Sequence, residues 1–232
     1  MPSTEDSIPV KRRSQLYRRH VQLGARFMHD KNSLSVDRYE ESEHKRASNL
    51  ALSDLSMLPR IGFKGSDVNE WLKSQNINVP SEPNQATLHL DGSWMCRLSK
   101  QEFMMTESLG GKSLSFATLH SADVAGRVYK IPRADSHAWL SLSGTFASVV
   151  MSKLCAVDLS DRTFRNGSIA QTSLARVSAV ILRADLTPKT LNYHIFSDST
   201  SIEFLWDCLS DAMLEFRGVP VGVGTLRQLY CK

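Results

Sequence analysis

The chain has 232 residues and a formal net charge of +4, from 28 lysines and arginines against 24 aspartates and glutamates. A domain of this length buries roughly 70% of its extended-chain surface without help from disulfides or metals, and its four cysteines include no CxxC pair of the kind that binds structural zinc. Unpaired thiols favour a cytoplasmic protein, and no apolar run has the ~18 residues of a membrane span or the position of a secretion signal.

Residues 1–48 differ in composition from the rest of the chain. Residues 1–49 hold 10 basic and 7 acidic side chains, whereas the other 183 residues hold 18 and 17. Without a sustained apolar stripe, this stretch predicts a polar basic tail that is flexible or ordered by a partner. An arm that binds RNA or lipid is the alternative, although aromatic residues are sparse in it.

The folded part begins near Leu50 and contains the same local plan twice, over residues 60–79 and 138–159. In each copy an alternating strand reaches a glycine, Gly65 or Gly144, where the chain must turn sharply. A polar residue that can cap a helix follows each glycine, and apolar residues then recur at helical spacing. This repeat predicts an α+β fold.

The stretch between the two copies predicts strands. TLHLDGSWMCRL has the alternation of a β-hairpin with Asp91-Gly92 as its turn, and a third strand is expected over 101–106. The loop over 107–113 contains Gly-Lys-Ser but has Thr106 where a phosphate-binding loop needs its first glycine. Nucleotide binding is therefore not expected.

After the second copy, the apolar run over 170–183 predicts one or two strands broken around Ser173, with a strand over 191–197 beside it. A helix is expected over 200–216, where Thr200 and Glu203 have capping-box spacing. The glycine-rich end of the chain predicts loose packing.

Asp135-Ser136-His137 contains the three residue types of a catalytic triad, but adjacent residues on an extended chain point to opposite faces. We therefore expect Asp135 and His137 to share one face, where they anchor a strand or contact a partner. The seven histidines show neither HxH nor HxxxH spacing, which disfavours a metal site.

Basic residues that are candidates for an anion site or a partner contact are Arg60, Lys64, Arg133 and Arg176. Asp207 and Asp211 lie four residues apart on the polar side of the last predicted helix, a spacing of like charges that suggests a basic partner. The four tryptophans fall on inward positions, which core packing explains better than base stacking. We predict no catalytic, cofactor-binding or metal-binding residue.

Five segments follow one another over about residues 50–216: LPRIGFKG, DGSWMCRLSKQEFMM, IPRADSHAWLSLSG, AQTSLARVSAVILR and FSDSTSIEFLWDCL. In these segments and their order the chain resembles the gamma subunits of heterotetrameric sarcosine oxidases. Those subunits are similar to glycine-cleavage aminomethyltransferases and to the N-terminal fold of tRNA-modification GTPases. The resemblance implies two interleaved α/β lobes, residues 49–128 and 129–232, packed as one unit and lacking the C-terminal barrel.

The resemblance also implies partners and cofactors. Alpha, beta and delta subunits would accompany this chain in a complex that oxidises the N-methyl group of sarcosine. FAD, FMN, NAD, tetrahydrofolate and zinc are expected on those subunits, and no cofactor is expected on this chain, which has no GxGxxG after a strand.

The chain departs from folate-binding relatives, which usually carry an Asn-Asp pair after the first helix, because residues 76–80 read Asn-Ile-Asn-Val-Pro. This favours a non-catalytic scaffold subunit. The first alternative is a stand-alone tetrahydrofolate-binding one-carbon transfer protein with a pocket lined by Arg60, Arg133 or Arg176. The second is a nucleic-acid-binding module that uses residues 1–48, with salt-dependent affinity.

Overall fold

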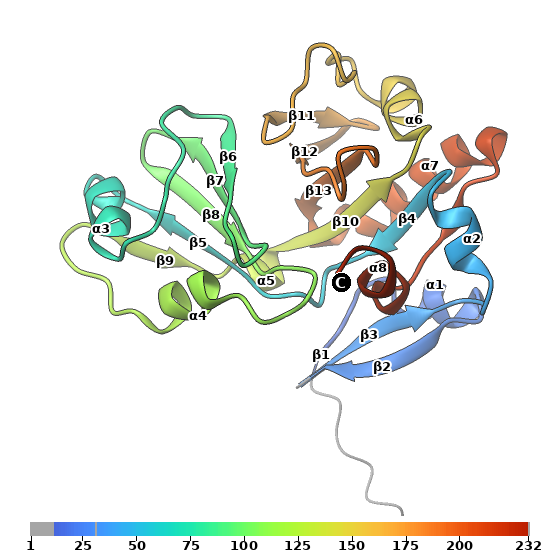
Figure 1. Ribbon diagram of the computed structural model, residues 1–232, viewed down its shortest axis with the longest axis horizontal. Coiled ribbons are helices and arrows are strands. Elements are labelled where there is room, and N and C mark those ends of the chain that lie inside the picture. The colour runs from blue at the N-terminus through green and yellow to red at the C-terminus, as the bar shows by residue number, and fades with distance from the viewer. Residues whose placement is uncertain (1–11, 31, 232) are drawn as a thin grey trace, which may run out of the picture.

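The structure is a computed structural model that describes residues 12–30 and 32–231. Two sheets form its centre (Figure 1). The five-stranded sheet has the order β6-β7-β8-β5-β9 and the six-stranded sheet the order β11-β12-β13-β10-β4-β14. The strands of the five-stranded sheet are β5 (Arg60–Lys64), β6 (Gln85–Leu88), β7 (Trp94–Ser99), β8 (Glu102–Thr106) and β9 (Tyr129–Ile131). Those of the six-stranded sheet are β4 (Ala51–Asp54), β10 (His137–Ser143), β11 (Ile169–Leu174), β12 (Val177–Arg183), β13 (Asn192–Asp198) and β14 (Val219–Pro220).

Helices cover the outer face of each sheet, and the inner faces pack on one another. Apolar side chains of α3 (Val68–Ser74) and α4 (Leu114–Ser121) share a core with the five-stranded sheet. Those of α6 (Ala147–Leu154) and α7 (Ile202–Met213) share another with the six-stranded sheet. A third core, which includes Trp94 and Trp139, joins the two inner faces. The α+β fold of two interleaved lobes is therefore confirmed.

The chain crosses between the lobes twice, over residues 55–59 and 132–136. β4 precedes the first crossing yet belongs to the six-stranded sheet, and β9 lies beyond residue 128 yet belongs to the five-stranded sheet. The predicted division at 128/129 therefore does not match the lobes, because β9 follows it and still belongs to the five-stranded sheet. Pairing between strands decides which lobe a strand joins, and the local sequence does not reveal that pairing.

The expectation of a tail is wrong for residues 12–48. They form β1 (Arg12–Arg13), α1 (Tyr17–Gln22), β2 (Arg26–Asp30), β3 (Ser33–Arg38) and α2 (Glu43–Ala47), with a sheet of order β1-β3-β2. Single apolar residues such as Leu16 and Val36 are buried without making a periodic stripe. The buried His20 also bonds through Nε2 to Asp54 Oδ2 of β4 at 2.9 Å. Residues 1–11 of the predicted tail lie outside the described part.

Both strand–glycine–helix units are confirmed. Gly65 follows β5 with φ +145°, and Gly144 follows β10 with φ +115°. The expected caps are wrong, since Asp67 and Phe146 occupy the N-cap positions of α3 and α6 and neither side chain caps its helix.

The hairpin, the strand after it and the loop over 107–113 are confirmed, but Asp91-Gly92 is not the predicted two-residue turn, because β6 ends at Leu88 and β7 begins only at Trp94. The predicted break in the 170–183 run lies at Ala175 and Arg176, both with positive φ, rather than at Ser173. At the last predicted helix, Asp198 accepts a hydrogen bond from the Thr200 amide at 2.8 Å in place of the capping box, and helical turns η1 (Ser199–Ser201) and η2 (Leu214–Phe216) flank α7.

The chain end is not loosely packed. β14 pairs in parallel with β4, and α8 (Val223–Tyr230) buries Val223 and Leu226 against the core between the sheets. α5 (Arg133–Ser136) completes the helices of the described residues, none of which is long and apolar enough to cross a membrane.

Candidate functional site

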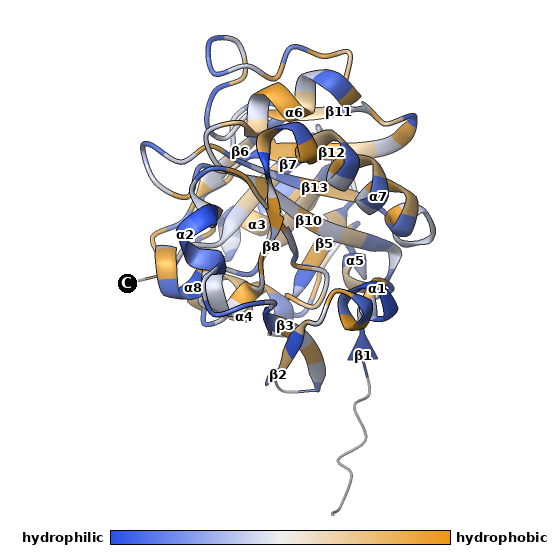
Figure 2. Cartoon of the chain, turned by 90° about the vertical axis from the view of Figure 1, so that its right-hand side faces the viewer, coloured by the Kyte–Doolittle hydropathy of each residue, from blue (hydrophilic) through white to orange (hydrophobic). Residues whose placement is uncertain are grey.

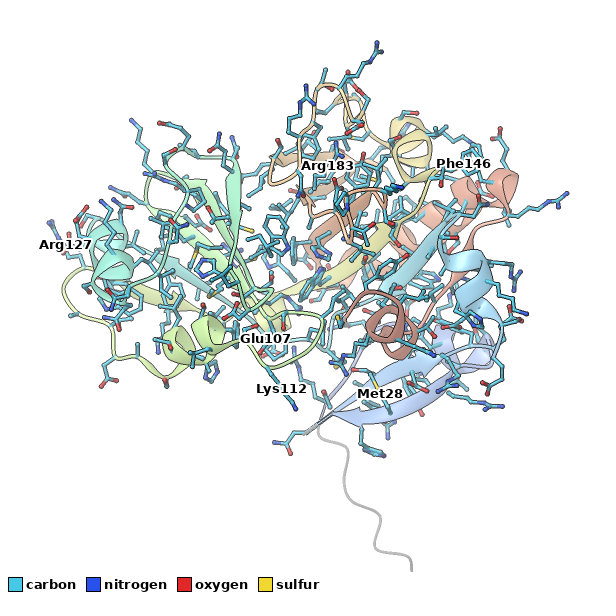
Figure 3. All side chains as sticks on the ribbon, viewed as in Figure 1. Met28, Glu107, Lys112, Arg127, Phe146 and Arg183 are labelled. Carbon is cyan, nitrogen blue, oxygen red and sulfur yellow. The ribbon has the colours of Figure 1, made fainter. Side chains whose placement is uncertain are left out.

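A cleft of about 460 Å³ lies where the inner faces of the lobes diverge. The smaller, five-stranded lobe contributes the hairpin turn around Asp91 and the loop that begins at Glu107. Figure 3 shows Glu107 between the two lobes. The larger, six-stranded lobe contributes Trp139, Asp185 and His194, and the end of α8 adds Tyr230. Segments far apart in the sequence therefore meet at one cavity.

Aromatic side chains form the buried side of the cleft. Alternation along β10 and β13 places Trp139 and His194 on the inner face of their sheet, with ring centroids 5.1 Å apart. Burial lowers the pKa of His194 to about 3, so its imidazole is neutral at physiological pH. Trp139 Nε1 is buried and has no hydrogen-bond partner among the described residues. One wall of the cleft thus holds a buried indole donor that no described residue engages, beside a neutral imidazole.

Two carboxylates of the cleft are held by nearby groups. Asp91 accepts hydrogen bonds from the amides of Ser93 and Ser115 at 3.1 and 2.7 Å, and from the Ser93 hydroxyl. Burial alone would raise the pKa of Asp91, but these bonds outweigh it and lower the pKa to about 2. Asp185 pairs with Arg183, whose Nη2 lies 2.8 Å from Asp185 Oδ2. Asp91 therefore remains ionised at neutral pH, and Asp185 is held in place by the guanidinium of Arg183.

Glu107 organises the loop that carries Gly-Lys-Ser. Its Oε1 accepts hydrogen bonds from the amides of Ser108 and Ser113, each at 2.9 Å, and from the Ser113 hydroxyl. In a phosphate-binding loop, amides of this kind point at the anion. Here the amides of Ser108 and Ser113 point at a carboxylate of the same loop, so these two amides are not available to a phosphate.

The predicted basic cluster lies at the lobe crossings, outside the cleft. The buried Arg60 donates from Nη1 to the carbonyls of Ser56 and Leu58, at 3.0 and 2.9 Å, and from Nη2 to the carbonyls of Ala134 and His137. Burial first, and Arg12 second, lower the pKa of Arg60 to about 10, so it stays charged at neutral pH. Arg60 therefore ties the two crossings together.

The other candidates have different surroundings. Glu102 pairs with Arg133 and lies 3.4 Å from Lys64 Nζ, so one carboxylate brings these two cations together. Arg176 lies at the turn between β11 and β12 and takes no part in the cluster. None of Arg60, Arg133 and Arg176 is among the residues that line the cleft, which contradicts the pocket expected for the folate-binding alternative.

The Asp135-Ser136-His137 sequence is not on an extended strand, because Asp135 and Ser136 belong to α5. The expectation that Asp135 and His137 share one strand face is therefore wrong. Asp135 instead lies 3.1 Å from Arg12. Arg133 donates to His137 Nε2 at 3.2 Å, so the neutral ring donates from Nδ1 to the Ser136 hydroxyl at 2.8 Å. Burial, then Arg133 and Arg60, lower the pKa of His137. The Ser136 hydroxyl thus accepts a hydrogen bond from the ring and itself donates to the Pro132 carbonyl, so the ring does not act on it as a base.

Sequence reasoning missed the residues that form the cleft. Trp139 was expected in the core, and it is buried, as are the other tryptophans; its unpartnered Nε1 has no sequence signal. His194 lies at a position of strand alternation that faces inward, which was the available signal. Among the described residues, no group of three His, Cys, Asp or Glu side chains is placed to hold a metal ion.

Comparison with models of protein families shows the family to which the chain belongs. The GCVT N-terminal domain model matches residues 16–231, which confirms the resemblance at the level of the family and includes most of the segment expected to be a tail. No curated protein matches the sequence.

Solved structures share the fold, among them a sarcosine oxidase chain and an aminomethyltransferase. A chain of heterotetrameric sarcosine oxidase from Corynebacterium sp. U-96, in complex with pyrrole 2-carboxylate, is 22% identical with a TM-score of 0.61 over 72% of this chain and 85% of that chain. Glycine cleavage system aminomethyltransferase T from Bartonella henselae is 18% identical with a TM-score of 0.71 over 94% of this chain. The match spans 62% of that aminomethyltransferase chain.

Proposed function

We propose that this chain, which belongs to the GCVT N-terminal domain family, is a non-catalytic structural subunit of a sarcosine oxidase-type complex, in the position of the gamma subunit. One observation carries the proposal: the carboxylates of the cleft are engaged by groups of the same chain. A general acid or base in one-carbon transfer works best with a pKa near the operating pH. Asp91, with a pKa of about 2, is far from it.

The other two carboxylates support the same conclusion. Asp185 is held by the buried Arg183, and Glu107 uses Oε1 to hold its loop together. An enzyme-like cleft whose acidic groups serve the fold suits a subunit that scaffolds a complex.

The proposal places the chemistry on other chains. Alpha, beta and delta partner subunits would hold FAD, FMN, NAD, tetrahydrofolate and zinc, and the assembled cytoplasmic complex would oxidise the N-methyl group of sarcosine. The fold shared with a chain of a heterotetrameric sarcosine oxidase supports this arrangement.

Co-expression with candidate large subunits, followed by size-exclusion chromatography and a flavin absorbance trace, tests the proposal. We expect the chain to co-elute with the subunits that carry flavin. Elution as a separate, catalytically active monomer would overturn the proposal.

A stand-alone tetrahydrofolate-binding protein is the second candidate, and the cleft itself favours it. The free Trp139 Nε1 and the Trp94 ring fit a planar heterocycle that accepts a hydrogen bond. Isothermal titration calorimetry with tetrahydrofolate tests this candidate, and Trp139→Phe, which keeps an aromatic ring without the donor, should weaken binding about fivefold, the value of one net hydrogen bond. Absence of binding heat with the wild-type chain removes this candidate.

A further inference from the structure

A second hollow, of about 250 Å³, lies on the outer side of the larger lobe between α1, α7 and β14. Its floor is buried and apolar, formed by Leu52, Trp206 and Met213. Two leucines on its rim are exposed, Leu23 at 48% and Leu214 at 70%. Figure 2 shows α1 and α7 together on the side that faces the viewer. We call this hollow the α1–α7 groove.

A row of carboxylates runs along the exposed side of α7 and continues into η2. Glu203, Asp207, Asp211 and Glu215 are spaced by four residues, so they follow one side of the helix, and all four are exposed. Asp207 itself lines the α1–α7 groove, so the row borders the hollow.

Internal cations neutralise only part of this row. Arg19 of α1 lies 2.5 Å from Asp207, and Lys153 of α6 pairs with Glu215. Glu203 and Asp211 have no ion pair with any of the described residues. The groove therefore combines an apolar floor, exposed leucines and the Arg19–Asp207 pair, while Glu203 and Asp211, which lack a counter-charge, lie on the same helix outside its lining.

We propose that the α1–α7 groove seats a cationic amphipathic segment of a partner chain. Apolar side chains of that segment would fill the space above Trp206 between Leu23 and Leu214, and its lysines or arginines would meet Glu203 and Asp211. Apolar anchors in a groove beside complementary charges are the usual arrangement for an amphipathic helix bound by a protein.

Other occupants fit the charges less well. Residues 1–11 of the chain carry Glu5 and Asp6 against a single lysine, Lys11, so the row of carboxylates disfavours them. An anionic membrane surface is disfavoured for the same reason, because it attracts basic segments. The inference rests on the proposed function only in that both require a partner chain.

A labelled amphipathic peptide of leucine and lysine is the probe, with fluorescence anisotropy on the full chain as the readout. We expect saturable binding that weakens with added salt, and about tenfold weaker binding to each of Leu214→Glu, Leu23→Glu and Asp211→Lys. Tyr129→Glu changes a 65%-exposed aromatic of the smaller lobe and is the matched control, expected to bind as the wild type does. Circular dichroism establishes that each variant is folded.

Equal binding of the wild-type chain to a leucine–glutamate peptide, or unchanged binding by all three groove variants, would overturn the inference. The same variants separate it from the proposed function in the co-expression experiment. If the wild type assembles with flavin-bearing subunits and the groove variants assemble equally well, the groove inference fails and the proposed function stands. If no chain assembles but the peptide still binds at the groove, the proposed function fails and the groove inference stands.

Discussion

In the smaller lobe Gly65 connects β5 to α3, and in the larger lobe Gly144 connects β10 to α6. An added Cβ would lie 1.8 Å from the carbonyl oxygen of Arg127 at Gly65, and 2.6 Å from that of Asn49 at Gly144. Each of these carbonyls is shortly followed by a strand that pairs with the unit: β9 pairs with β5, and β4 pairs with β10. The two lobes therefore repeat one arrangement of strand, glycine, helix and incoming neighbour.

The two incoming strands, β9 and β4, differ in their other contacts. β9 is an edge strand preceded by an exposed loop. β4 also pairs with β14, and its Asp54 binds the segment that contains α1. The same local unit thus supports a simple edge in one lobe and two added segments in the other, and those added segments form the α1–α7 groove. Substitutions at matched positions test whether this difference governs stability.

The largest effect is expected from the two glycines. Gly144→Ala forces a Cβ against Asn49 and the buried Leu50, at a backbone φ that is unfavourable for a residue with a side chain. The backbone strain and the overpacking add, so we expect the free energy of unfolding to fall by up to about 6 kcal/mol. Gly65→Ala has the closer contact, but the loop at Arg127 is exposed and can shift, which limits the loss to about 1–3 kcal/mol.

Urea denaturation measures both losses. Gly110→Ala is the control, because its nearest atom would be 3.7 Å away and its φ is not positive. If Gly65→Ala is the more damaging of the two, the loop is as fixed as the core strand, and the distinction between the lobes fails.

The next effect concerns the attachment of residues 12–47 to β4. Asp54→Ala removes the partner of the buried His20 Nε2, whose ring then keeps only Tyr39, and Ser14 and the Ser56 amide also lose their acceptor. Each buried polar group left unsatisfied costs about 1–3 kcal/mol. Denaturation with urea gives the loss, and limited proteolysis shows whether the region of α1 is released first.

In the smaller lobe, Asp67→Ala removes an exposed carboxylate that binds the Arg127 amide, and its effect should be far smaller. Comparable losses for the two variants would contradict this prediction.

The third effect is a pH dependence that belongs to the larger lobe. Burial lowers the pKa of His194 from 6.5 to about 3 in the folded chain. The unfolded chain therefore binds a proton first as pH falls, so stability is complete above pH 6.5 and decreases between pH 6.5 and about 3 by about 1.4 kcal/mol per pH unit. Thermal or urea denaturation as a function of pH measures the slope.

His194→Phe should remove most of that slope. His137→Gln is the matched variant, since the pKa of His137 is also lowered but its ring is only partly buried, and it should remove less. A slope that survives in His194→Phe would assign the pH dependence to another group.

Local signals in the sequence predicted the elements that are long or punctuated by special residues. Gly65 and Gly144 marked the two repeated units, and the apolar stripe of α7 marked its helix. Some elements that were missed are too short to show periodicity: β1 and β14 have two residues each, and α2 has five. Others, such as β3 with six residues and α8 with eight, lie in stretches whose composition predicted a polar tail or loose packing, and they are stable because distant partners bury them.

The candidate site, too, was predicted only in part. Arg60, Arg133 and His137 do come together, since the two crossings bring them there, but the sequence could not show that carbonyls and Glu102 engage the cations. The cleft was not predicted because Trp139 and His194 lie 55 positions apart and meet only through the pairing of β10 with β13. The unpartnered indole nitrogen of Trp139 in this cleft results from how the side chains pack, which the sequence does not show.

The smallest expected effect is that of the ion pair between Arg19 and Asp207, which links α1 to α7 at the groove. Both side chains are about half exposed, and exposed pairs contribute only about 0.2–1 kcal/mol. Asp207→Asn should therefore change urea stability within that range, and added salt should reduce the difference. A double-mutant cycle with Arg19→Met isolates the pair. A coupling well above 1 kcal/mol would mean that the pair fastens the added segment to the larger lobe, a role that we assign to Asp54. A weak coupling has a further consequence, because charge changes along this row then leave the fold intact, and weaker peptide binding by Asp211→Lys reports on the groove itself.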